Sequence, residues 1–210
     1  MKRVDIITGN AVPLLQANVD TDQILPKQFL RTISREGLAG ALFFDWRFDE
    51  TGAEIPDFIL NQTPYRHASI LIAGENFACG SSREHAVWAL LDYGISCVIA
   101  PSFAEIFAGN AANNGLLLIT LPKADVEALA AEAAGQSTDF RIDLPLQIIT
   151  TPSGRELAFE FDAGTKRKLI AGLDAIGETQ LHERAIAAFE TQQNEALPWL
   201  SGSSAPGIAR

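Results

Sequence analysis

The chain has 210 residues, of which 47% are hydrophobic and 20% are charged, and its formal net charge is −10. This length and composition are typical of one globular domain with a sizeable core, and they exclude global disorder. The acidic balance argues against binding to nucleic acid or to an anionic membrane, because phosphate binding depends on Lys and Arg.

The two cysteines, Cys79 and Cys97, are too few for a disulfide-stabilised scaffold. Both lie near apolar runs, where a small core residue is the simplest interpretation. The N-terminus has no uninterrupted apolar region of the kind that a signal peptide needs. No apolar stretch approaches the roughly 20 residues that cross a bilayer, so we expect a cytoplasmic protein.

The N-terminal part of the chain predicts a short strand over residues 11–17, a turn over residues 18–22 and a possible helix from Lys27. Residues 34–64 are punctuated by Gly and Pro but contain many aromatic side chains. An irregular segment with this much apolar surface is either packed or available to a partner. We therefore expect a flexible loop over residues 34–64 that orders when a partner docks.

The middle of the chain alternates between buried strands and helices. The strands are predicted over residues 68–73, 96–100 and 116–121. One helix is expected over residues 83–93 with its end at Gly94, a second begins at Pro101, and the polar residues 109–115 read as a loop. This alternation predicts a parallel sheet with right-handed crossovers.

The C-terminal part predicts three helices around a β-hairpin. The helices are expected over residues 123–134, 165–172 and 178–192. The hairpin has its turn at residues 151–154, between strands over residues 142–150 and 156–161. We expect a single domain over residues 1–195 and a disordered tail over residues 196–210.

Residues 74–86 connect the first predicted strand to the helix that follows it, and they carry the candidate site. Ligands of open α/β sheets bind at the carboxyl ends of the strands, and a helix N-terminus favours anions. Ser81 and Glu84 have the spacing of a capping box, which would explain Ser81 without a function. Arg83 is expected in the first helical turn, where its charge opposes the helix dipole. A carboxylate ligand is the natural reason for an arginine there.

The run Gly80-Ser81-Ser82-Arg83-Glu84-His85-Ala86 resembles the signature of the swivelling domain of the aconitase superfamily. Further blocks resemble bacterial 3-isopropylmalate dehydratase small subunits, and they are residues 18–30, 44–48, 56–58, 101–107 and 172–177. The resemblance extends from about Val12 to Glu190. It implies an α/β fold, a three-layer β/β/α swivelling domain with a central, mostly parallel sheet and C-terminal helices.

The resemblance also implies a reaction, the isomerisation of 2-isopropylmalate to 3-isopropylmalate by dehydration and rehydration through isopropylmaleate, in leucine biosynthesis. It implies that Ser81 is the base, that Arg83 binds a substrate carboxylate and that Ser82 helps to hold the substrate. A serine among anion-stabilising groups loses its proton more easily than usual. Lys27 and Arg31 are candidates for binding the second carboxylate, and solvated surface cations are the alternative interpretation of both.

The family uses a 4Fe–4S cluster, and such a cluster needs three protein thiolates even when one iron lacks a protein ligand. A chain with two cysteines cannot supply them. We therefore expect no cofactor on this chain and a large-subunit partner that carries the cluster.

Two other functions stay open, which are an enzyme for another substituted malate (methylmalate/citraconate or dimethylmalate) and a catalytically silent binding module. The intact Ser81, Ser82 and Arg83 argue against the silent module. Asp20 and Asp22 are expected to tether their loop through Asx-turns. Ala78 stands where the family usually has glycine, and we expect it to adopt a permitted conformation.

Overall fold

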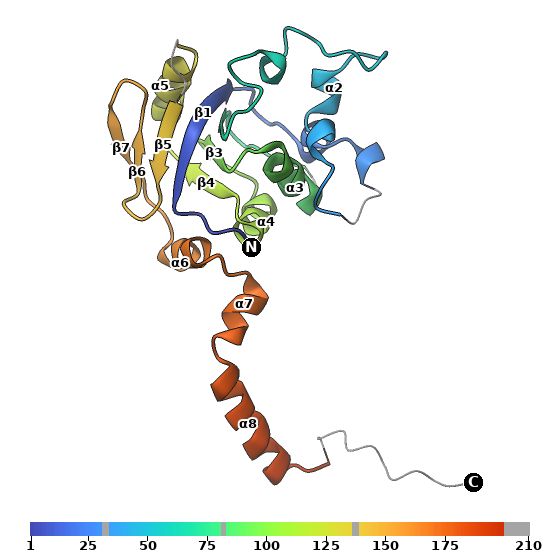
Figure 1. The fold of residues 1–210 in the computed structure, drawn as a ribbon, viewed down its shortest axis with the longest axis vertical. Coiled ribbons are helices and arrows are strands. Elements are labelled where there is room, and N and C mark those ends of the chain that lie inside the picture. The colour runs from blue at the N-terminus through green and yellow to red at the C-terminus, as the bar shows by residue number, and fades with distance from the viewer. Residues whose placement is uncertain (31–33, 81–82, 136–138, 200–210) are drawn as a thin grey trace, which may run out of the picture. The chain divides into compact units, whose positions relative to one another are not determined.

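In the computed structural model we describe residues 1–30, 34–80, 83–135 and 139–199. The chain divides into two compact units, Met1–Leu173 and Asp174–Arg210. The N-terminal unit contains a seven-stranded sheet with the order β4-β3-β2-β1-β5-β6-β7 (Figure 1). Its strands are β1 (Ile6–Leu14), β2 (Ile70–Ala73), β3 (Cys97–Ala100), β4 (Leu117–Thr120), β5 (Asp139–Asp143), β6 (Ile148–Thr150) and β7 (Glu156–Ala158).

Strands β1 to β4 are parallel, and β5, β6 and β7 extend the sheet in antiparallel fashion. Strand β1 belongs to both parts: its last four residues pair with β2, with Leu14 opposite Ala73, and its first five pair with β5. All residues of β2 and β3 are buried, as expected for parallel strands that are covered on both faces.

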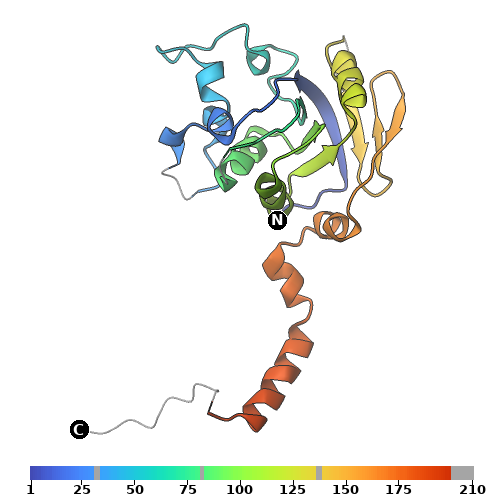
Figure 2. The ribbon, with the colours of Figure 1, turned by 180° about the vertical axis from the view of Figure 1, so that it is seen from behind.

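Helices cover the parallel strands on both faces (Figures 1 and 2). On one face, α3 (Glu84–Tyr93) and α4 (Glu105–Asn114) pack over side chains such as Leu71 and Val98. On the other, α5 (Lys123–Ala133) packs over Ile70 and Ile99. The unit also contains α6 (Ala163–Ala171). The predicted α/β class with its parallel strands and C-terminal helices is confirmed.

Several predicted boundaries are wrong. Residues 109–115 do not form a loop, because α4 continues to Asn114 and Gly115 ends it in a left-handed conformation. The helix predicted from Lys27 is a single 3-10 turn, Lys27–Phe29, and the helix α1 (Thr21–Ile24) begins within the turn predicted over residues 18–22. The predicted strand over residues 142–150 consists of the end of β5, a turn and β6.

Residues 34–64 fold onto the body of the N-terminal unit through short helices. These are the 3-10 turns Ala39–Ala41 and Ile59–Asn61 and the helix α2 (Phe44–Arg47). Phe43 and Leu60 are almost fully buried, and the Phe43 ring stacks on Trp46 with centroids 5.5 Å apart. That the segment orders only with a partner stays a prediction.

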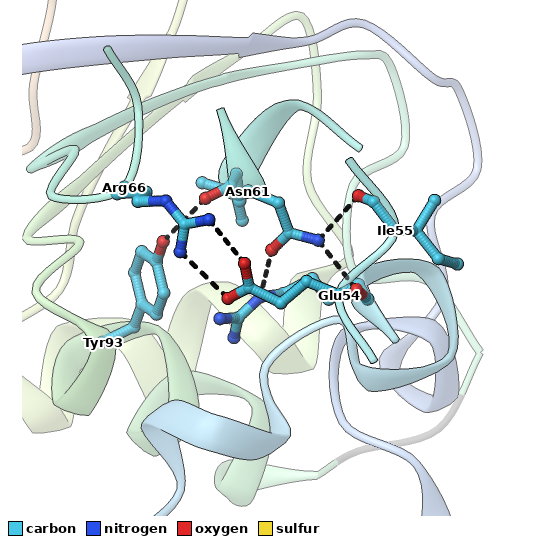
Figure 3. Close-up of polar contacts among 7 residues, drawn as sticks. Glu54, Ile55, Asn61, Arg66 and Tyr93 are labelled. Atoms are coloured by element: carbon cyan, nitrogen blue, oxygen red, sulfur yellow. Dashed lines mark hydrogen bonds and ion pairs between the residues drawn. The ribbon is translucent and has the colours of Figure 1, made fainter. Parts of the chain in front are cut away.

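A buried polar network fixes this segment (Figure 3). The Arg47 Nε donates to Asn61 Oδ1 at 3.3 Å, and the Asn61 amide donates to the carbonyls of Arg47 and Ile55 at 2.7 and 2.9 Å. Beside it, Arg66 forms an ion pair with Glu54. Burial lowers the pKa of Arg47. The network satisfies a guanidinium that is only 8% exposed, so it defines one packing for the segment.

The C-terminal unit contains α7 (Ala175–Gln180) and α8 (Glu183–Ala196). The single helix predicted over residues 178–192 is therefore two helices. Residues 200–210 of the predicted tail lie outside the described part of the chain. Within the described ranges, no helix is both long and apolar enough to cross a membrane.

Candidate active site at the carboxyl edge of the parallel strands

The loop over residues 74–80 follows β2 and is held on both sides by its neighbours' backbones. Toward the segment after β1, Asn18 donates to Glu75 O at 2.9 Å, and Cys79 donates to Val19 O at 3.1 Å. Toward the segment after β3, the Phe77 N–H donates to Ser102 O at 3.1 Å. These bonds fix the loop at the carboxyl edge of the sheet, where α/β proteins bind their ligands.

Several positions of this loop have demanding backbone requirements, since Asn76, Ala78 and Gly80 all have a positive φ and Gly74 is tightly packed. A Cβ on Gly74 would lie 2.3 Å from the Gln16 carbonyl oxygen, so only glycine fits between β2 and the segment after β1. Ala78 has a φ of +60° and is buried. The prediction that Ala78 adopts a permitted conformation is therefore wrong, because the left-handed region is strained for a residue with a Cβ.

Helix α1 presents the acidic part of the site. The Asp20 carboxylate accepts from the Gln23 N–H at 2.7 Å, and the Gln23 side chain accepts from the Asp20 N–H at 2.8 Å. Through this capping box the Asp20 side chain holds the first turn of α1, which is the local structural role that we expected of Asp20. The Thr21 N–H donates to Cys79 O at 3.1 Å, so the helix is attached to the loop over residues 74–80.

Arg83 and Lys27 meet at Asp22. The Arg83 Nη1 contacts the Asp22 carboxylate, and the Lys27 Nζ lies 3.8 Å from the other oxygen of that carboxylate. The Arg83 side chain is 19% exposed, against 74% for Lys27. Asp22 thus forms ion pairs with two predicted substrate-binding cations, whereas we had expected it to form an Asx-turn.

The start of α3 differs from the predicted capping box. Arg83 is the N-cap residue with an extended backbone, so Ser81 and Glu84 do not occupy the N-cap and N3 positions. Glu84 instead accepts from the Asn114 amide at 2.7 Å, and Asn114 in turn accepts from the Trp88 indole at 3.0 Å. The acidic side chain of the signature therefore joins α3 to α4.

Of the predicted site residues, Arg83 and Lys27 are brought together, and Ser81, Ser82 and Arg31 lie outside the described residues. Sequence reasoning missed Asp22 as the anion between the two cations. The only available signal was its position in a polar motif before a short apolar run, and that signal does not identify a partner 61 residues away.

The cysteines do not suit an iron–sulfur cluster. The Cys79 thiol donates to Asn18 O at 3.4 Å, whereas Cys97 is buried within β3. Burial raises the pKa of the Cys97 thiol well above its usual value, and a ligand would have to be a thiolate. Among the described residues, no group of three or more His, Cys, Asp or Glu side chains could hold a metal ion. The described residues of this chain, with one cysteine buried in a strand, therefore do not fit a cluster.

A cleft of about 460 Å³ lies at the opposite edge of the sheet, and none of the described candidate residues lines it. Ser69 and Ser96, which precede β2 and β3, contribute to it, as do Gly94 and Gly115 at the ends of α3 and α4. Helix C-termini carry partial negative charge and disfavour anions. Lys2 and Arg3 also line the cleft and oppose this effect, so the edge with Arg83 is preferred because it contains the described candidate residues and not because of its charge.

Comparisons with known proteins bear on the family and the fold of the chain. The family model for the aconitase C-terminal domain matches residues 1–124. The 3-isopropylmalate dehydratase small subunit of Caulobacter vibrioides is 52% identical, with 95% of this chain and 99% of the relative covered. That of Rhodospirillum centenum is 52% identical over 96% of this chain and all of the relative. A crystal structure of a 3-isopropylmalate dehydratase from Methanocaldococcus jannaschii superposes with a TM-score of 0.63 at 30% identity, covering 89% of this chain and 99% of that chain.

Proposed function

Because the chain belongs to the family of 3-isopropylmalate dehydratase small subunits, we propose that it is one half of a hydro-lyase that acts in leucine biosynthesis. The reaction would interconvert 2-isopropylmalate and 3-isopropylmalate through isopropylmaleate. The observation that carries this proposal is the position of Arg83, a largely buried cation beside Lys27 at the carboxyl edge of the sheet. Such a pair suits a small substrate with two carboxylates.

In this proposal Ser81 is the base and Arg83 is the clamp. The Ser81 oxygen takes the proton from a substrate carbon next to a carboxylate, a hydroxyl leaves the neighbouring carbon, and the two carbons become doubly bonded. Water then adds in the opposite sense. Arg83 binds the carboxylate on which charge accumulates as the proton leaves, Ser82 helps to hold the substrate, and Lys27 or Arg31 binds the second carboxylate.

We also propose that the large subunit carries a 4Fe–4S cluster, which would supply a Lewis acid for the departing hydroxyl. Two cysteines on different elements, one of them buried in a strand, are the reason to look for the cluster elsewhere. The active site would then lie between two chains in the cytoplasm. Residues 34–64 would complete their ordering against the large subunit, as part of a single domain over residues 1–195.

Reconstitution with the large subunit tests the base. In the reconstituted enzyme, Ser81→Ala should lower kcat by about 10²–10⁴-fold, the range expected for the loss of a general base, with little change in KM. Ser153→Ala is the matched control, because Ser153 lies in the β6–β7 turn, where its hydroxyl donates to the Glu132 carboxylate and not to a candidate site residue. Full turnover by the Ser81→Ala enzyme would refute the assignment and would favour a silent binding module.

Assays with a panel of 2-substituted malates test the substrate. The proposal expects the highest kcat/KM with 2-isopropylmalate or 3-isopropylmalate. A higher value with methylmalate, citraconate or dimethylmalate would assign the chain to another enzyme of the same reaction class. Turnover by the purified small subunit with no second protein would contradict the shared site.

A further inference from the structure

We propose that Asp22 is a positioning residue, which orients the Arg83 guanidinium for the substrate carboxylate and does not itself touch the substrate. The inference deepens the proposed function and rests on it, because it assigns a role to a residue that acts through Arg83. It starts from the contact between the Arg83 Nη1 and the Asp22 carboxylate, which joins α3 to α1.

The first step concerns what holds Arg83. Its backbone is extended at the N-cap of α3, and its side chain makes no capping hydrogen bond to that helix. An arginine side chain has several rotatable bonds, and immobilising it costs up to about 2 kcal/mol of conformational entropy. The Asp22 contact fixes the end of the side chain before a substrate arrives. A substrate that meets a pre-oriented guanidinium avoids most of that cost.

The second step concerns what holds Asp22. The capping box between Asp20 and Gln23 closes the first turn of α1, and Thr21 is buried and bonded to the Cys79 carbonyl. Cys79 in turn donates to Val19. Asp22 therefore stands on a turn that is fastened to the loop over residues 74–80, which leads into the signature serines. The carboxylate that orients Arg83 is therefore held by main-chain bonds to the same loop that precedes the proposed base in the sequence.

The third step concerns the charge and the donors that remain. Asp22 is shared by two cations, Arg83 and Lys27, so the three side chains together carry one net positive charge in a chain whose total is −10. The guanidinium has five N–H donors. Because Nη1 contacts Asp22, the edge formed by Nε and Nη2 supplies the two parallel donors that a carboxylate accepts. Asp22 thus orients Arg83 without neutralising the site.

Kinetics of the reconstituted enzyme distinguish positioning from a structural tie. Asp22→Asn keeps an oxygen acceptor but removes the charge, and we expect KM to rise about tenfold, together with a fall in kcat because Arg83 also binds the charge that accumulates as the proton leaves. If the contact between Asp22 and Arg83 served only to stabilise the fold, Asp22→Asn would lower the free energy of unfolding and leave KM unchanged. Asp22→Glu keeps the charge but moves it by one methylene, and we expect a KM between those of the parent and Asp22→Asn.

A double-mutant cycle with Arg83→Gln completes the test. If Asp22 acts through Arg83, then adding Asp22→Asn to Arg83→Gln produces no further rise in KM. Additive effects, or an unchanged KM in both Asp22 variants, would overturn the positioning role. An unchanged KM in Arg83→Gln alone would instead overturn the clamp in the proposed function, so the two failures are distinguishable. Glu132→Gln is the control, because it removes a carboxylate 3.5 Å from Arg155 on the far side of the unit and should change neither constant.

Discussion

Replacing Ala78 with glycine measures the strain that the site loop contains. Ala78 has a φ of +60° and is 1% exposed. A left-handed conformation costs an L-residue about 1–2 kcal/mol, and glycine removes that cost. Two losses of stability oppose this gain. They are about 0.8 kcal/mol for the removal of a buried methyl group and about 0.5–1 kcal/mol for the greater freedom of glycine in the unfolded chain. The two sides are similar in size, so Ala78→Gly should leave the free energy of unfolding within about 1 kcal/mol of the parent.

The matched control is Ala11→Gly. Ala11 is as fully buried as Ala78 but lies in β1, where alanine needs no unusual backbone conformation. This control should lose about 1.3–1.8 kcal/mol, because it incurs the same losses with no strain to relieve. Urea unfolding of both variants beside the parent gives the comparison. If Ala78→Gly loses as much as Ala11→Gly, the loop is not strained at this position and the reasoning fails.

Three further outcomes follow from the described contacts. Asn61→Ala should lower the free energy of unfolding by about 2–3 kcal/mol, because it removes three hydrogen bonds and leaves the Nε of the buried Arg47 without its acceptor. A change in the free energy of unfolding of under about 0.5 kcal/mol, measured by urea unfolding, would contradict the network. The hydrogen bond from Arg66 lowers the pKa of Glu54 below its ordinary value of 4.5. The stabilisation by this pair is therefore fully present at a pH above 4.5, and it is lost as the pH falls through the lowered pKa. Glu54→Gln should therefore flatten the acid limb of a stability–pH curve, and an unchanged limb would count against the pair. Iodoacetamide should label Cys79 well before Cys97 in the folded chain and both equally in urea, as peptide mass spectrometry would show, since burial raises the pKa of Cys97.

The parallel part of the sheet was predictable because its strands are covered on both faces. Runs such as Ile70–Ala73 and Cys97–Ala100 contain no polar residue, and a strand with this composition is stable only between two layers of helices. The end of α3 was predictable for a local reason, since Gly94 takes the left-handed conformation that commonly ends a helix.

The extent of α4 was not predictable, because tertiary contacts decide it. Glycine and asparagine favour turns in a local reading, yet the Asn114 amide bonds to Glu84 on α3 and to the Asn110 carbonyl one turn earlier. The pairing of Asp22 with Arg83 was hidden for a similar reason. The two residues are 61 positions apart, and only the folded backbone brings α1 beside the start of α3.

The attachment of the site loop through main-chain groups has a consequence for how such an enzyme can change. Side chains at positions 75 and 79 can be exchanged without removing the main-chain hydrogen bonds that anchor these residues to the segment after β1. Gly74 is an exception, because the Gln16 carbonyl occupies the space of any side chain there, and the positive φ of Asn76 and Ala78 restricts the choice at those two positions. The side chains around Arg83 and Lys27 can therefore be varied to accept new substrates, while the main-chain hydrogen bonds that position the loop stay unchanged.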